Sequence, residues 1–299
     1  MLPPYVVGAY AAEPAPREPW YEALAAQDWV CGLEIPWPGD LAENTGWLAK
    51  YLPARFDSTV ITAIPGTMVR MGADPVRGLA SPDQEGRKRA LADVAELRDG
   101  LARLCDATGF AAARWVHLHS APRQVADAAA LAASLEELSG WDWCGASPVI
   151  EHCDRFVAGQ PPQKGFLPIS AELDAAAAAG TGVSINWGRS AIEARSGAVV
   201  AEHIAAAARR GLLRGVMFSG AGEAENYYGK SWEDLHLPLA ADEPTSLLDD
   251  AEVLRCAAAW GEQAPAYVGA KIQARAEWDV ERRLSAARRA YDVLAAREA

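Results

Sequence analysis

The sequence contains few cysteines, and none has a neighbour in the spacing that commonly binds metal. The five cysteines among 299 residues are scattered, odd in number and without any Cys-x-x-Cys pair. This argues against a structural zinc cage and gives no support to a disulfide framework. Most are expected to be small buried hydrophobic residues. Cys153 is set apart because it lies within a polar stretch of sequence.

Basic residues are in deficit. Lysine and arginine number 28 against 40 aspartate and glutamate residues, which gives a net charge of −12. A nucleic-acid partner is therefore not expected, because binding to a phosphate backbone requires basic surface. The deficit does not exclude a small anionic substrate, which needs only a local positive site.

Long apolar runs are also missing. No segment approaches the roughly 20 apolar residues that cross a bilayer. Residues 1–4 lead directly into a strand-like segment and lack the basic-then-apolar pattern of a secretion signal. We therefore expect a cytoplasmic protein with no membrane partner.

What the sequence does have is a regular alternation of short β-branched runs with longer helical stretches rich in alanine and leucine. Strands are expected at residues 5–10, 29–35, 58–64, 113–119, 147–152, 183–187, 215–219 and 267–272. Helices are expected at residues 20–26, 44–51, 81–107, 125–138, 169–179, 199–210, 246–260 and 278–297. This alternation predicts an α/β fold, a single (β/α)8 TIM barrel domain over residues 1–299.

Two long connections and one helix boundary can also be predicted. Residues 65–80 are expected to form a long loop, and residues 220–245 a long insertion. Ser81 is the expected N-cap of the third helix and Pro82 its first residue, while Gly109 ends it.

Polar and aromatic side chains gather where the expected strands end. TIM-barrel enzymes carry their reacting groups at the carboxyl ends of the strands and in the loops that follow. The candidates at these positions are Glu34, Trp37, His117, His119, Glu151, Asn186, Trp187, Arg189, Ser219 and Lys271. Because nearly every strand supplies one of them, the sequence predicts a site on this rim.

This layout resembles that of the xylose-isomerase-like TIM-barrel superfamily of sugar isomerases and epimerases, which also includes apurinic endonuclease relatives. The resemblance extends over essentially the whole chain, but in layout rather than in motif identity. It implies that Glu151 is the carboxylate that ends strand five in the family. Strand six of the family supplies an Asp and, three residues on, a His, where this chain has Asn186 and Arg189. Ser219 stands at the position of the family's strand-seven His, and Lys271 at that of its strand-eight Glu.

These replacements change the electrostatics expected at the rim. Arg189 and Lys271 place positive charge where the family holds a cation, so we expect the inherited metal site to be lost and assign no metal ligand. A divalent metal in a rearranged site stays open. Its ligands would come from Glu151, His152, Asp154, His117 or His119.

Glu151, Lys271 and His119 are the expected catalytic residues. Lys271, facing Glu151, would stabilise an enediolate as the cation would have, while Glu151 or His119 moves the proton next to a carbonyl. Strand alternation places His117 and His119 on one face, and Glu151 and His152 on opposite faces. The alternatives are a Schiff base on Lys271, a buried Lys–Glu ion pair that only holds the barrel end together, and histidines with a structural role.

The insertion after the seventh expected strand is aromatic and polar. Residues 225–232 predict a lid or a sugar platform, to which residues 234–238 could add a carboxylate and an imidazole. A packed surface loop or a dimer contact is the alternative. Backbone N–H groups of residues 219–222 are a candidate phosphate site, and Arg189 or Lys230 could recognise an anionic group. The expected substrate-binding residues are thus Glu34, Trp37, His117, Asn186, Trp187, Arg189, Ser219, Trp232 and His236.

Three functions are consistent with these observations. The leading hypothesis is an isomerase or epimerase of a sugar or keto-sugar, for which both a metal-independent and a metal-assisted mechanism stay open. The second is a lyase or aldolase that acts through Lys271, and the third is a sugar-binding barrel without catalysis. In each case the partner is a small carbohydrate, and exposed aromatic residues on the long loops allow a homodimer.

Overall fold

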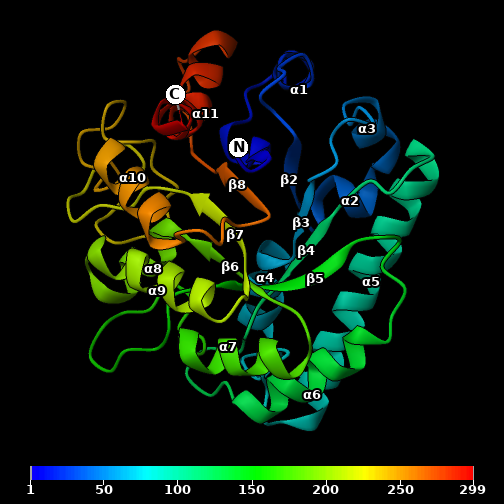
Figure 1. Ribbon diagram of the computed structural model, residues 1–299. Helices are drawn as coiled ribbons and strands as arrows, with labels where there is room; N and C mark the ends of the chain where they lie inside the picture. The colour runs from blue at the N-terminus through cyan, green and yellow to red at the C-terminus, as the bar shows by residue number, and fades with distance from the viewer. Residues whose placement is uncertain (1, 299) are drawn as a thin grey trace. The chain divides into compact units, whose positions relative to one another are not determined.

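The protein, described over residues 2–298 by a computed structural model, forms a closed barrel of eight strands in sequence order (Figure 1). The strands are β1 (Tyr5–Val7), β2 (Gly32–Pro36), β3 (Val60–Thr62), β4 (Trp115–Leu118), β5 (Ser147–His152), β6 (Val183–Asn186), β7 (Leu213–Phe218) and β8 (Tyr267–Ala270). The helices are η1 (Ala9–Ala12), α1 (Glu18–Ala25), α2 (Gly39–Glu43), α3 (Thr45–Lys50), α4 (Ile64–Ala73), α5 (Gln84–Thr108), α6 (Ala128–Ser139), α7 (Ile169–Ala178), α8 (Trp187–Ala194), α9 (Ala198–Arg209), α10 (Asp250–Ala259) and α11 (Val280–Glu298). The predicted (β/α)8 fold class is confirmed.

All eight expected strands are present, most of them shorter than expected. Their residues are almost entirely buried, as in parallel sheets that are covered on both faces. The register of β4 on β5 pairs His117 with Val149 and Leu118 with Ile150. This register brings the ends of the two strands, which carry His119 and Glu151, level with each other.

Contacts within the chain define two compact units. We name the described residues of 35–184 the central unit, and those of 1–34 and 185–299 the terminal unit. In the central unit α5 packs on α2, α3 and α6, and α6 packs on α7, as Figure 1 shows. In the terminal unit α11 packs on α1 and α10, while α9 packs on α8 and α10.

The prediction that residues 65–80 form a loop is wrong for its first half, where α4 lies. Pro65 and two glycines in this segment indicated a loop, but proline is well tolerated in the first turn of a helix. Ile64 and Met71 join a buried cluster with Phe166, so that tertiary packing stabilises the helix. A second helix that was not expected, α8, begins directly after β6 and is capped by the side chain of Asn186.

The start of α5 differs from its prediction, whereas its end does not. The N-cap is Asp83, whose Oδ1 accepts the backbone N–H of Gly86 at 2.6 Å, so Ser81 is not the cap. The hydroxyl of Ser81 instead accepts the N–H of Asp83 at 3.2 Å and shapes the approach to the helix. Gly109 ends the helix in the left-handed conformation, with φ of 77°, as expected.

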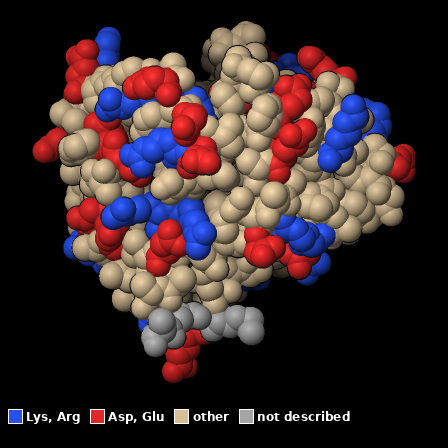
Figure 2. Space-filling view, turned by 90° about the horizontal axis from the view of Figure 1, so that it is seen from above, with Lys and Arg blue, Asp and Glu red and all other residues tan. Residues whose placement is uncertain are grey.

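Two further findings bear on the expected partners. Among the described residues, no helix combines the length and apolarity needed to span a membrane. On the face shown in Figure 2, lysine and arginine are interspersed with aspartate and glutamate.

Replacing the N-cap of α5 should destabilise the fold. We expect Asp83→Ala to lower the free energy of unfolding by about 1 kcal/mol, because the N–H of Gly86 loses its acceptor. Urea titration followed by circular dichroism measures this change. Asp83→Asn, which retains a capping oxygen, is the matched control, and equal destabilisation by both variants would contradict the assignment.

Candidate functional site

Glu151, at the end of β5, is the centre of the polar cluster of the central unit. Its Oε2 lies 2.8 Å from Nε2 of His119 and 3.6 Å from Nδ1 of His117. The exposed fractions of these three residues are 0–2%. Both histidines approach the same carboxylate oxygen, which confirms that they share one face of β4.

His152 points to the other side of β5, also as expected. Its Nδ1 lies 2.6 Å from Oε2 of Glu172, a residue of α7. The hydroxyl of Ser120 donates to the other oxygen of Glu172. Glu172 was not among the predicted residues, because a single glutamate in an alanine-rich helix usually faces solvent, whereas here it is fully buried.

Asp154 is bonded to backbone N–H groups, and Cys153 lies among apolar side chains. The carboxylate of Asp154 accepts the backbone N–H groups of Gln163 and Lys164 at 2.9 Å, and that of Gly165 at 3.2 Å. These bonds explain how the carboxylate is buried at 1% exposure and hold the loop before α7. Cys153 belongs to the buried hydrophobic cluster of α4 rather than to a polar group of side chains.

Lys271 and Glu34 form a buried ion pair in the terminal unit. The Lys271 ammonium donates to Oε1 of Glu34 at 2.7 Å, and Tyr10 donates its hydroxyl to the same oxygen at 3.1 Å. The ammonium also lies 5.8 Å from the centre of the Tyr10 ring. Gly8 makes room for Lys271, since a Cβ at this position would lie 2.7 Å from the Cβ and Cγ of the lysine. The carboxylate expected to pair with Lys271 was Glu151, and the partner within this unit is Glu34.

The insertion is tied to the rim residues of the same unit through Asp234. Its Oδ2 accepts from Nε of Arg189 at 3.1 Å, and its Oδ1 lies 3.3 Å from Nδ1 of His236. Ser219 lies 2.7 Å from the same Nδ1 of His236. In a catalytic triad the serine and the carboxylate contact opposite ring nitrogens, so this arrangement is not a triad. Asp234 instead compensates the charge of Arg189 and holds the insertion, residues 220–245, in place.

The remaining predicted residues of the terminal unit also have defined places. Trp232 stacks under the guanidinium of Arg195, 5.2 Å from its centre, and accepts from Arg195 through its carbonyl. Trp187 is fully buried at the start of α8. The N–H of Gly220 donates to the carbonyl of Leu237 at 2.8 Å, which takes one donor away from the proposed backbone phosphate site.

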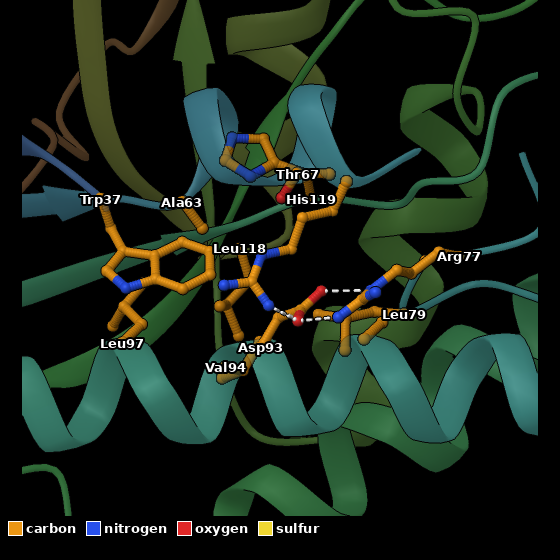
Figure 3. A pocket seen from close by; sticks show the side chains of 13 residues that line it. Trp37, Ala63, Thr67, Arg77, Leu79, Asp93, Val94, Leu97, Leu118 and His119 are labelled. Carbon is orange, nitrogen blue, oxygen red and sulfur yellow. Dashed lines mark hydrogen bonds and ion pairs between the residues drawn. The ribbon is translucent and has the colours of Figure 1, made fainter. Parts of the chain in front are cut away.

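A cavity in the central unit joins Trp37 and His119, two predicted site residues, to residues that were not predicted. Its volume is about 20 Å³, enough for one or two water molecules but not for a sugar ring. Thr67, Arg70 and Arg77 line it, and they come from the segment expected to be a loop. Figure 3 shows Asp93 of α5 joined to Arg77 by dashed lines, with Trp37 and His119 on other sides of the cavity.

Close backbone approach fixes one wall of this cavity. The N–H of Gly66 donates to the carbonyl of Trp37 at 3.0 Å. A Cβ at position 66 would overlap the six-membered ring of the Trp37 indole, so glycine is required for the indole to lie against α4. The Trp37 ring in turn stacks on the guanidinium of Arg70, 4.8 Å from its centre.

The end of the insertion is fixed by Glu243, which is 3% exposed. It accepts from the hydroxyl of Thr245 at 2.8 Å and from Arg275 at 3.0 Å. Burial alone would raise the pKa of Glu243, but the hydrogen bonds from Thr245 and Arg275 outweigh it and lower the pKa below its ordinary value. The carboxylate therefore stabilises the folded state.

This contribution should depend on pH. Because the folded-state pKa of Glu243 is lowered, its stabilisation is complete above the ordinary pKa of 4.5 and is lost as the pH falls through the folded-state pKa. We expect Glu243→Gln to lower the free energy of unfolding at pH 7 and to approach wild type below pH 4.5. Urea titrations at stepped pH measure the difference.

Glu252 provides a control, because its pKa is shifted in the opposite direction to that of Glu243. Its burial raises its pKa, so the ionised carboxylate costs stability that is recovered as the pH falls. The difference between wild type and Glu252→Gln should therefore change with pH in the opposite direction. Identical pH dependence of the two differences would contradict the role given to Glu243.

Comparison with known proteins identifies sequence relatives of the chain. A family model described as a domain of unknown function, DUF4862, matches residues 6–286. An uncharacterized protein of Salmonella typhimurium is 34% identical over 297 residues, which cover 94% of this chain and 93% of that protein.

Solved structures share the fold at low sequence identity. One titled a putative xylose isomerase, from Rhodospirillum rubrum, has a TM-score of 0.64 at 12% identity and covers 99% of both chains. One titled a D-tagatose 3-epimerase-like protein has a TM-score of 0.61 at 15% identity, covering 99% of this chain and 100% of the other. The fold is thus that of the xylose-isomerase-like TIM barrels, as the resemblance in sequence layout implied.

Proposed function

The chain belongs to the DUF4862 family, and we propose that it isomerises or epimerises a sugar or keto-sugar by moving a proton at a carbon next to a carbonyl group. The observation that carries this proposal is the buried contact between Glu151 and His119, at 2.8 Å. The titles of structures that share the fold, among them a D-tagatose 3-epimerase-like protein and a putative xylose isomerase, support a sugar as the substrate.

The pair supplies the two proton-transfer groups that this chemistry requires. Glu151 takes the proton from the carbon, and His119 donates a proton to the carbonyl oxygen, which gives an enediol. Isomerisation follows when Glu151 returns the proton to the neighbouring carbon while the hydroxyl on the first carbon gives its proton to His119. Epimerisation follows when a solvent proton reaches the first carbon on its opposite face, the hydroxyl formed from the carbonyl returns its proton to His119, and Glu151 releases its proton to solvent. His117, 3.6 Å from the same carboxylate, helps to hold the Glu151 side chain in place.

The side chains at the inherited ligand positions of the terminal unit do not fit a divalent cation. Asn186 caps α8 through its side-chain oxygen, and Ser219 bonds to His236. Lys271 is itself a cation, paired with Glu34. We therefore propose that the proton transfer needs no bound metal, and no step is derived through one.

The surroundings of Lys271 do not favour covalent catalysis. The Glu34 carboxylate at 2.7 Å favours the protonated ammonium, whereas a Schiff base requires the neutral amine. Lys271 is therefore given an ion-pair role with Glu34 within the terminal unit. A lyase that acts through Lys271 is the less favoured function for the same reason.

Removing the carboxylate of Glu151 should abolish the proton transfer. With a panel of aldoses and ketoses in deuterated water, wild type should incorporate deuterium at carbon, as measured by NMR. Glu151→Gln should lower the rate at least 100-fold, the usual contribution of a positioned base. Glu202→Gln, at an exposed position of α9, is the matched control and should retain the full rate.

Two other outcomes would replace the proposal. Sugar binding by wild type that survives in Glu151→Gln and Lys271→Met, without exchange in either case, would indicate a binding protein. Borohydride trapping of a carbonyl substrate on Lys271, located by peptide mass, would indicate a lyase. Exchange that disappears on chelation and returns with Mn²⁺ or Mg²⁺ would contradict the metal-free mechanism.

A further inference from the structure

The cavity beside His119 is lined by two arginines, and we infer that it is the subsite for a carboxylate group of the substrate. The substrate class is then a sugar acid rather than a neutral sugar. This inference rests on the proposed function, since it specifies what the same site accepts. All the residues that carry it lie in the central unit.

The position of the cavity places it at the functional end of the barrel. Trp37 follows β2, Ala63 follows β3 and His119 follows β4, so three successive strands contribute their carboxyl ends to its wall. Active sites of TIM barrels are built at this end. His119 lines the cavity and also contacts Glu151, which connects the subsite directly to the proposed proton-transfer pair.

Two guanidinium groups line the cavity, and only one of their partners is a buried carboxylate. Arg77 binds Asp93 with two hydrogen bonds, one of them donated by Nε at 2.7 Å, and Arg70 also pairs with Asp93. The other partner of Arg70 is Glu96, whose side chain is 59% exposed. The formal charges of these four groups balance, so a carboxylate that enters the cavity competes with the exposed Glu96 for Arg70.

Hydrogen-bond donors remain available on this wall. Within the described residues, Nε of Arg70 and the second terminal nitrogen of Arg77, Nη1, make no hydrogen bond, and neither does the hydroxyl of Thr67. Guanidinium donors arranged in a plane suit the two oxygens of a carboxylate. The stacking of Arg70 on Trp37 restrains this guanidinium before any ligand arrives.

The size of the cavity selects the group that enters it. At about 20 Å³ it accepts a planar terminal group with little more volume than one or two waters. A sugar ring does not fit, and a tetrahedral phosphate is bulkier than a planar carboxylate. The carboxylate of a sugar acid suits this space.

The test compares sugar acids with their neutral counterparts in the exchange assay. We expect D-galacturonate and D-glucuronate to exchange at carbon with a KM at least 10-fold lower than that of D-galactose and D-glucose. Arg77→Gln and Arg70→Gln should raise the KM for the acids by 10- to 100-fold, a larger factor than for the neutral sugars, because each removes charge-assisted hydrogen bonds. Arg98→Gln, which removes a partly exposed guanidinium stacked on Trp141, is the matched control and should change the KM of neither class.

Folding of the variants is tested independently, because Arg77 also anchors Asp93. Calorimetric titration of the wild-type protein with D-galacturonate and D-galactose requires no variant, and only the acid should bind with measurable heat. Arg77→Lys keeps the charge but loses the paired geometry, and it should recover part of the affinity that Arg77→Gln loses.

Three results would overturn the carboxylate subsite. They are equal affinity for acids and neutral sugars, equal losses in Arg77→Gln and Arg98→Gln, and preference for D-glucose 6-phosphate over D-glucuronate. Failure of the proposed function has a different signature. If the acids bind with dependence on Arg77 but no sugar exchanges a proton, the subsite stands and the isomerase proposal does not.

Discussion

The structure depends above all on the requirement that a buried charge have a partner. Glu151 is fully buried, and an unpaired carboxylate in that position would cost several kcal/mol. His119 contacts it at 2.8 Å and His117 lies 3.6 Å from the same oxygen, and both reach it in the observed register of β4 on β5. A slip of one residue would turn both histidines to the other face, so strand register and the chemistry of the site are fixed together.

The same requirement explains how the rim residues of the terminal unit are accommodated. Lys271 is buried against Glu34, and Arg189 against Asp234. Each cation is compensated by a carboxylate within its own unit. A buried ammonium and a buried guanidinium are thus both accommodated by ion pairs.

The helices and strands could be predicted from the sequence more accurately than the hydrogen-bond and ion-pair partners of the site residues. Eight apolar runs with helical stretches between them were enough for the barrel, because parallel strands buried on both faces have a distinct composition. Glu151, His117 and His119 were also found from the sequence, because they are polar residues at the ends of predicted strands, where TIM barrels carry their reacting groups. The partners of these residues depend on long-range contacts, as with Glu172 on α7 and Glu34 beside Lys271.

Thr67 and Arg70, which line the cavity, were not predicted as site residues, because the helix that carries them was not predicted. Ile64 was predicted to end a strand and Pro65-Gly66 to begin a loop, yet tertiary packing makes all three residues the first turn of α4. Gly66 has a further consequence, because its backbone lies against the Trp37 indole and leaves no room for any side chain. The shape of the cavity therefore cannot change through a side chain at position 66. A smaller residue in place of Trp37 would enlarge the cavity and also leave space for a side chain there.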